Sequence, residues 1–459
     1  MVKRNSFFKQ IVFVCLFGIT LTSCKPKENL LPNSPGEINL QQFVAIGDGN
    51  TAGYMDDALY LYGQQNSLGT ILQRHLSLVG AAEPIVPWMG ASNIGINLTN
   101  QSRLILGYKT DCKGVSALSP IRYAFQGEQG ALTTSVYYEP NKFSNWGIPG
   151  LRMLDLSSSL LGNSQMPNYN PFFGRMSNDQ LNSSPPWGAT SVLDNIFDGA
   201  SPTFCAIFLG IEDFLPYAKS GATTNPMSPL AGLPGQGFDE SIHVLLDQLS
   251  SHGAKGVIAT LPLVNQLPYF TTIVYNGLDL TAENAASLNQ IYNPLGYTFI
   301  EGDNPFMIED PSAGGFGVRP MQEGELLVLR LPLDSVRCNQ MGSVYPFRDE
   351  FVLTLEEVQE INNRILLYNQ SIRQWANSVG FAIAETSEFY SNLNDGFTYN
   401  GVSMSAKFVS GGVFSLDAIH LNGRGNALLS NVFIAAINKK YQSRIPLINP
   451  LIYSSIYFP

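Results

Sequence analysis

Charged residues are scarce in this sequence. Asp, Glu, Lys and Arg make up 14% of its 459 residues, whereas hydrophobic residues make up 44%. This composition excludes a disordered chain, which has many charges and few apolar side chains. Basic residues are fewer than acidic ones, 26 against 36, and the formal net charge is −10. We therefore expect no binding to nucleic acid, because its phosphates favour basic surfaces.

Cysteine is also scarce, with five in the chain. None lies at the short spacing from another Cys or from His that zinc sites use, so we expect neither a metal nor a cofactor. Cys15 and Cys24 belong to the N-terminal segment. Cys205 lies in an apolar run and is expected to be a small core residue. Cys112 and Cys338 lie in polar sequence and can pair if the protein is exported, but spacing alone does not decide this.

Long apolar runs are missing as well. Residues 11–21 are apolar but too few to span a bilayer comfortably. They follow a basic start, which is typical of a secretory signal peptide, predicted for residues 1–23. The junction Leu21-Thr22-Ser23-Cys24 resembles the bacterial lipobox, in which the cysteine is acylated. We expect Cys24 to carry lipid and to anchor the protein to a membrane of the bacterial cell envelope, with the outer membrane as the expected location.

The rest of the chain divides into a short tether and one long domain. Residues 24–38 are polar and interrupted by prolines, which suits a tether. Residues 39–459 show no repeat and no change of composition, so we predict a single domain. Irregular stretches near residues 100–140, 162–190 and 295–350 are predicted to be insertions, the first of them a hairpin or long excursion. The sequence gives no indication of oligomeric state.

The domain is predicted to be organised around residues 43–54. An apolar run from Phe43 to Ile46 breaks into Gly47-Asp48-Gly49, the pattern of a buried strand that ends in a tight turn. Further on, an apolar strand at 203–209, an amphipathic helix at 239–252 and a strand at 255–261 predict a parallel strand–helix–strand unit. A capping box at Thr354 and Glu357 begins the most regular helix, and residues 426–441 form the closing helix. The fold class is therefore α/β.

The chemistry centres on Asp417 and His420, just before the closing helix. An Asp three residues before a His on a loop can reach the imidazole, fix its tautomer and raise its basicity, as a general base requires. Most such pairs are surface or capping residues. This pair, however, follows three other blocks: the turn after Gly47, the stretch Asn145-Trp146-Gly147, and Gly210-Ile211-Glu212-Asp213.

In these four blocks the chain resembles the SGNH, or GDSL, hydrolase family. In that family a Gly-Asp-Ser turn carries the nucleophile, a Gly and an Asn line the oxyanion hole, and a C-terminal Asp-x-x-His completes the triad. The matching blocks span residues 43–441 in the family's order. The stretches 58–67, 261–269 and 415–425 look like lipobox-bearing members of the family from Bacteroidetes-type bacteria. The resemblance implies a flavodoxin-like three-layer α/β/α sandwich with a central parallel sheet, and hydrolysis of an ester or acylated saccharide.

Two replacements affect the implied catalytic residues. Asp48 keeps its place, but the serine position is Gly49, which has no side chain to attack a carbonyl. The oxyanion position of Asn is Glu212, whose carboxylate would repel an oxyanion. Gly147 is the implied backbone donor of the oxyanion hole. Thr51 is a poor substitute nucleophile, because it lies two residues further along the turn. We therefore expect a weakened or inactive esterase-like protein.

Three alternatives remain open for this site. In the first, a water fills the vacant space at Gly49 and is activated by His420 or Glu212, giving slow hydrolysis. In the second, the protein is a non-catalytic envelope lipoprotein that binds an ester, acyl or saccharide ligand. In the third, Asp48, Glu212, Asp213 and His420 hold a divalent cation. For Asp213 we favour helix N-capping instead.

Overall fold

A computed structural model of the chain describes residues 31–91, 93–123, 142–177, 190–198, 201–313 and 317–456. The predicted signal peptide, Cys24 and residues 24–30 of the predicted tether lie outside these ranges, as do parts of the three predicted insertions. Asn33–Pro459 form one compact unit. Among the described residues, no helix combines the length and the apolar character needed to cross a membrane.

The core of this unit is a five-stranded sheet in which every neighbouring pair is parallel, which confirms the predicted α/β class. All residues of β1 and β7 are buried, as expected for apolar strands covered on both faces. Cys205 is a fully buried free thiol of β7, as its apolar surroundings predicted. The strand order is β15-β8-β7-β1-β6, with these bounds: β1 (Phe43–Gly47), β6 (Asn145–Gly147), β7 (Phe204–Phe208), β8 (Lys255–Ala259) and β15 (Ala382–Ala384).

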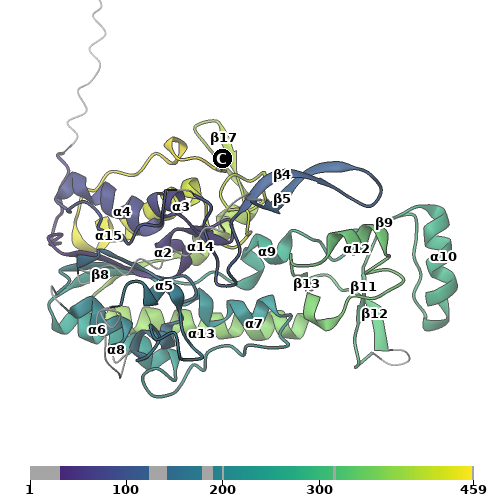
Figure 1. Cartoon of the computed structure of the whole chain (residues 1–459), viewed down its shortest axis with the longest axis horizontal. Coiled ribbons are helices and arrows are strands. Elements are labelled where there is room, and N and C mark those ends of the chain that lie inside the picture. Colours follow the sequence, from purple (N-terminus) through teal and green to yellow (C-terminus); the bar gives the residue numbers. More distant parts are fainter. Residues whose placement is uncertain are drawn as a thin grey trace, which may run out of the picture. The chain divides into compact units, whose positions relative to one another are not determined.

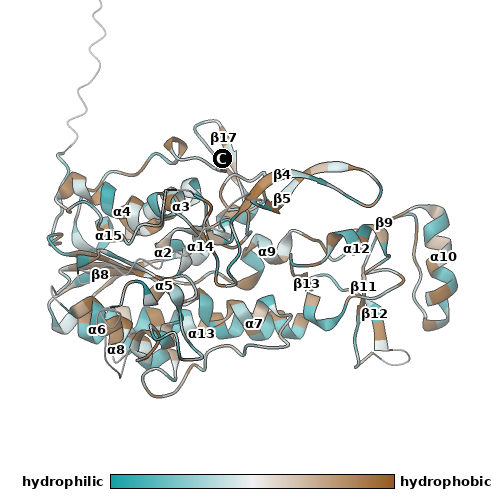
Figure 2. Cartoon of the chain, in the orientation of Figure 1, coloured by the Kyte–Doolittle hydropathy of each residue, from teal (hydrophilic) through white to brown (hydrophobic). Residues whose placement is uncertain are grey.

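Long helices pack against this sheet. Figure 1 shows α4 and α15 on one side of it and α8 and α13 on the other. Helix α4 contacts β1 and β6, while α13 and α15 both contact β8 and β15. In Figure 2, hydrophobic and hydrophilic residues alternate along α13, which packs against α8. The bounds are α4 (Leu68–Leu76), α8 (Phe238–Ser251), α13 (Leu355–Val379) and α15 (Gly423–Tyr441).

Helix α13 begins at the predicted capping box. The Glu357 N–H donates to Thr354 Oγ1, and the Thr354 N–H donates to Glu357 Oε2 at 2.8 Å. Each side chain therefore satisfies a backbone donor that the first turn of a helix leaves free. The helix buries apolar side chains three or four residues apart, namely Ile361, Ile365, Tyr368, Ile372 and Ala376.

Shorter elements connect the strands and position the loops at their ends. The described part of the 162–190 region holds the short helix α5. Residues Met153–Ser157 form a short 3-10 helix. The bounds are α2 (Gly49–Ala52), β2 (Tyr54–Met55), β3 (Ala58–Leu59), α3 (Leu61–Gln65), α5 (Pro171–Gly174), α6 (Val192–Phe197), α7 (Leu215–Lys219), α9 (Pro268–Thr271), α14 (Thr386–Asp395), β16 (Phe397–Tyr399) and β17 (Val402–Met404).

Two excursions extend from this core. One is the antiparallel hairpin of β4 (Leu104–Thr110) and β5 (Ser116–Arg122). The other contains small two-stranded sheets and a separate apolar cluster around α10. Its elements, including the neighbouring strand β14, are β9 (Leu278–Leu280), α10 (Ala282–Tyr292), β10 (Gly302–Asn304), β11 (Met307–Glu309), β12 (Val318–Pro320), β13 (Leu326–Leu327), α12 (Leu333–Cys338) and β14 (Val352–Leu353).

Candidate functional site

The predicted site residues meet at the carboxyl ends of the central strands. Asp48 directly follows β1, Glu212 lies four residues after β7, and the loop before α15 brings Asp417 and His420 to the same edge. Loops at this edge of a parallel sheet commonly form ligand sites. Here they open into a cavity of about 1030 Å³, and its wall includes Glu212, Asp417 and His420.

His420 is held by Asp417, as their spacing predicted. Nδ1 of the imidazole lies 2.9 Å from Asp417 Oδ2. The other carboxylate oxygen, Oδ1, accepts hydrogen bonds from the N–H groups of Ile419 (2.9 Å) and His420 (2.8 Å). Ala418, which follows Asp417 in the chain, has a φ of +61°, a conformation that non-glycine residues seldom adopt. The loop therefore folds back tightly enough for one carboxylate to bind both the backbone and the ring.

A second acidic turn, missed by the sequence analysis, supports this loop. Asp56 and Asp57 connect β2 to β3, both with positive φ, as a two-residue hairpin turn requires. Asp56 Oδ1 accepts from the Leu416 N–H (2.9 Å), and the Asp56 N–H donates to Ser415 Oγ (3.0 Å). The Asp57 N–H donates to Asp417 Oδ2 (3.2 Å). Two adjacent Asp residues between short apolar segments were the only signal in the sequence.

The charges around His420 favour a protonated ring. Burial lowers the pKa of the imidazole, but the carboxylates of Asp417, Glu212 and Asp48 outweigh burial, so the pKa lies above its usual value. Burial raises the pKa of Asp417, but His420 and the backbone hydrogen bonds lower it to about 2 overall. Among the described residues, Nε2 has no hydrogen-bond partner. His420 also forms part of the cavity wall.

Two further carboxyl groups hold protons more tightly than usual. Burial is the main cause that raises the pKa of Glu212, and His420 and Lys219 offset part of that rise. Asp48 is 1% exposed, and its burial, together with Glu212, raises its pKa to about 7. Glu212 is half-buried and lines the cavity, so it is the one of the two that can contact a ligand.

The space beside Gly49 is filled by the His420 imidazole. A Cβ at position 49 would lie 3.3 Å from Cε1 of the ring, 2.6 Å from Cδ2, and closer still to Nε2. The prediction of a vacant space that a water could fill is therefore wrong. Thr51 does not replace the serine, because its side chain is buried against Gly47.

The two glycines of the Gly147 block have different surroundings. The Gly147 N–H donates to Asn145 Oδ1 at 2.8 Å, and a Cβ there would lie 2.5 Å from Ala52 Cα. Gly147 therefore packs behind the turn and does not line the cavity. Gly150 does line it, with a φ of +79°. The second glycine of Gly147-Ile148-Pro149-Gly150 was the signal that sequence reasoning passed over.

Asp213 does not cap a helix, which corrects the role favoured from sequence. Helix α7 begins two residues later, at Leu215, without a side-chain cap. The Asp213 carboxylate instead accepts a hydrogen bond from the Met153 N–H at 2.7 Å and so holds the turn after β6. Within the described ranges, no group of three or more His, Cys, Asp or Glu is arranged to hold a metal ion, so the cation alternative has no geometric support.

These carboxyl groups predict that mild acid stabilises the protein. Burial raises the pKa of Asp48 and Asp213 from 3.8 to about 7 and that of Asp56 to about 6. Between about pH 4 and pH 7 the folded state thus binds protons that the unfolded state does not, so stability falls as the pH rises. The pKa of His420 is also raised, so His420 likewise makes stability fall as the pH rises. The lowered pKa of Asp417 has the opposite effect, but only below about pH 4.

Urea unfolding should therefore give a larger free energy at about pH 5 than at about pH 8. Asp213→Asn keeps an oxygen that can accept from Met153 but removes the titration, so it should flatten this profile. A free energy of unfolding that rises between the two pH values would contradict the expectation.

No family model matches the sequence, and no curated protein matches it.

Proposed function

We propose that this chain is a ligand-binding lipoprotein of the bacterial cell envelope, built on an SGNH-hydrolase-like scaffold that no longer uses a serine nucleophile. One observation carries the proposal: the imidazole of His420 lies where a side chain at Gly49 would begin. The ring keeps its Asp417 partner but has no hydroxyl to activate.

The sheet supports the scaffold. Numbered along the chain, its strands have the order 2-1-3-4-5, which is the flavodoxin-like order, whose ligands bind beside the first strand. Asp48 and Glu212 lie at that point, after β1 and β7. The helices on the two sides of the sheet in Figure 1 fit a three-layer α/β/α sandwich. A lipid on Cys24, inferred from the lipobox, would hold this domain at the outer membrane.

The charges of His420 and Glu212 fit the binding of a ligand better than they fit the hydrolysis of an ester. A general base must accept a proton, whereas the raised pKa of His420 favours the form that donates one. Glu212 stands where the family has an oxyanion donor, and the loss of one such donor typically slows acyl transfer by about 100- to 1000-fold. The Gly147 N–H is already bonded to Asn145. Without a nucleophile, covalent catalysis is lost altogether.

The cavity wall suits a ligand with hydroxyl, carbonyl or acyl groups. Nε2 of His420 offers a donor and Glu212 an acceptor, and the tyrosine rings offer flat apolar surfaces. An ester, an acylated compound or a saccharide has this mixture of groups. The neutral polar and aromatic side chains on the wall are Tyr54, Asn97, Thr99, Gln101, Ser119, Ser220, Thr223, Thr224, Asn225, Tyr269 and Phe408.

Glu212 supports a second candidate, slow hydrolysis by a water. Burial raises the pKa of Glu212 above its usual value, which makes its carboxylate a stronger base, and the side chain lines the cavity. In this reaction Glu212 would take a proton from water as the water attacks the ester carbonyl, and would return it to the alcohol oxygen as the ester C–O bond breaks. Because His420 occupies the place beside Gly49, that water would have to approach from the open cavity.

Ester hydrolysis by the full chain decides between the two. We expect no release of p-nitrophenol from p-nitrophenyl acetate or butyrate above the rate in buffer. A panel of free and acetylated saccharides should in turn contain compounds that raise the melting temperature, and His420→Gln should abolish that rise. Turnover by the parent chain that Glu212→Gln abolishes would establish the second candidate instead.

The variant Gly49→Ser/Glu212→Asn tests the scaffold itself. It restores a nucleophile and an oxyanion donor, so it should gain slow esterase activity once the His420 ring has shifted to admit the serine. Adding His420→Ala should remove that activity again. A folded double variant with no turnover would count against this alignment of the blocks.

A further inference from the structure

A hairpin and a distant helix are tied together beside this cavity. Cys112, between β4 and β5, forms a disulfide with Cys338, the last residue of α12, with their Cα atoms 6.3 Å apart. The sequence left this pairing open. Two ion pairs flank it: Lys109 Nζ lies 2.8 Å from Asp334 Oδ2, and Arg337 lies 3.5 Å from Asp111.

The hairpin contributes little to the hydrophobic core. Its two strands contact mainly each other, and the outer residues of both are exposed. Tyr108 is 76% exposed and Leu118 59%. An isolated two-stranded hairpin is marginally stable in water. Its position therefore depends on what holds its two ends.

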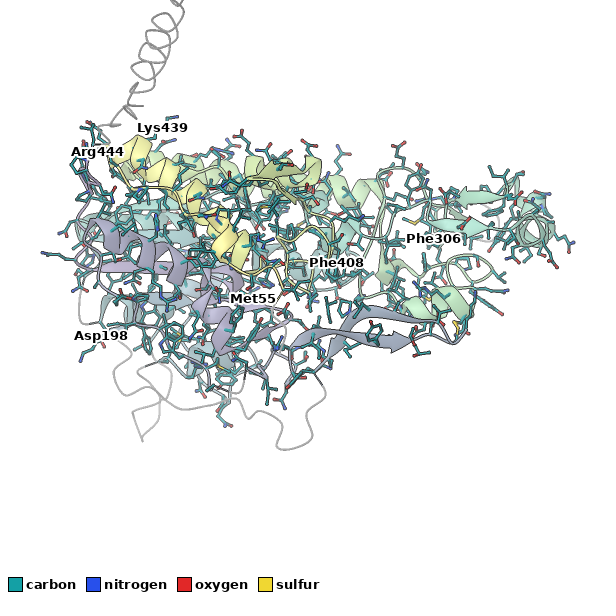
Figure 3. The ribbon with its side chains drawn as sticks, turned by 90° about the horizontal axis from the view of Figure 1, so that it is seen from above. Met55, Asp198, Phe306, Phe408, Lys439 and Arg444 are labelled. Atoms are coloured by element: carbon teal, nitrogen blue, oxygen red, sulfur yellow. A yellow bond between two sulfur atoms is a disulfide. The ribbon has the colours of Figure 1, made fainter. Side chains whose placement is uncertain are left out.

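The inner end is anchored at the candidate site. The Leu104 N–H donates to the Asp56 carbonyl at 2.7 Å, and Arg122 forms an ion pair with Asp57. Asp57 in turn donates to Asp417. In Figure 3 the hairpin runs from the region of Met55 toward the second excursion, where the disulfide holds its outer end.

Both tied elements form part of the cavity wall. The hairpin contributes Leu118 and Pro120 among others, and α12 contributes Leu333 and its two ion-pairing residues. Glu212 and other residues of the core also form part of the wall. The cavity is thus bounded by a closed loop of chain, which the disulfide completes.

We propose that the β4–β5 hairpin and α12, joined by Cys112–Cys338 and the two ion pairs, form an arch that limits the size of the molecules that reach Glu212 and His420. A disulfide keeps its two Cα atoms within about 7 Å, so the arch cannot open by separating its ends. A tie that only stabilised the fold would be expected between elements of the core, whereas this one joins two exposed elements at the cavity. The inference concerns access and holds whether or not the cavity hydrolyses its ligand.

Thiol labelling tests the arch without a known ligand. In the full chain carrying Glu212→Cys, the thiol at position 212 should react with N-ethylmaleimide. With a bulky polyethylene-glycol maleimide, it should react about tenfold or more slowly than an exposed reference thiol does. Ser251→Cys, exposed at the end of α8 and away from the cavity, is that reference. Mass mapping of the peptide that contains each position separates its reaction from that of other cysteines.

Removing the tie should admit the bulky reagent. With Cys112→Ser/Cys338→Ser added, the bulky reagent should react about tenfold faster at position 212. The rate of N-ethylmaleimide at position 212 and the rates at the reference thiol should stay unchanged. If that variant does not fold, reducing the disulfide in the folded Glu212→Cys protein is the second route to the same comparison. Fast labelling by the bulky reagent with the disulfide intact, or a rate unaffected by its loss, would overturn the arch.

Discussion

Replacing Asp417 with alanine should lower the free energy of unfolding by about 3–5 kcal/mol, because it removes one partner of a buried ion pair. The His420 side chain is 8% exposed and would lose the carboxylate, 2.9 Å away, that favours its protonated form. The N–H groups of Asp57, Ile419 and His420 would lose their acceptor at the same time. Urea denaturation at neutral pH measures the loss.

Two controls separate charge from packing. Asp417→Asn keeps an oxygen for the backbone N–H groups but removes the charge. It should therefore lower the free energy of unfolding by less than Asp417→Ala does. Asp247→Ala, on the exposed face of α8, should change the free energy of unfolding by less than about 0.5 kcal/mol. A loss below about 1 kcal/mol for Asp417→Ala would mean that no charged pair is buried there.

Gly147→Ala should lower the free energy of unfolding by about 3 kcal/mol or more, since overpacking against backbone leaves no side chain that can move aside. The added methyl would lie 2.5 Å from Ala52 Cα and from the Thr51 carbonyl carbon. Those atoms belong to α2, the turn that carries Gly49. Chemical denaturation reports the loss.

Gly253→Ala is the matched control for this substitution. Gly253 has a φ of +81°, but a Cβ there meets no atom within 4 Å, so only backbone strain of about 1–2 kcal/mol is expected. A Gly147→Ala variant as stable as this control would show that β6 and α2 can separate at little cost.

The features that the sequence predicted well depend on local interactions. Helix α13 follows from an apolar stripe and from a capping box whose partners, Thr354 and Glu357, are three residues apart. Strand β1 follows from a short apolar run that ends in glycine. The Asp417–His420 contact likewise joins residues three apart, so one tight loop is enough to form it.

The features that were left open or predicted wrongly depend on distant parts of the chain. Cys112 and Cys338 are separated by 226 residues, and no spacing rule reports such a pair. Asp213 suggested a helix cap because α7 follows it, but the partner it binds is Met153, which belongs to the turn after β6. Gly150 lines the cavity rather than Gly147, because backbone packing against α2 places the latter behind the wall.

The amino-acid sequence is enough to identify the chemical groups that this site has and lacks: an Asp417–His420 pair, a carboxylate at Glu212, and no hydroxyl at Gly49. The positions of those groups relative to one another follow from the fold. The imidazole fills the space beside Gly49 because a residue without a Cβ leaves room for it. Asp417 fixes the ring, and the Asp57 N–H in turn binds Asp417. The missing hydroxyl is visible in the sequence, whereas the placement of the ring depends on loops more than 300 residues apart, brought together by the sheet.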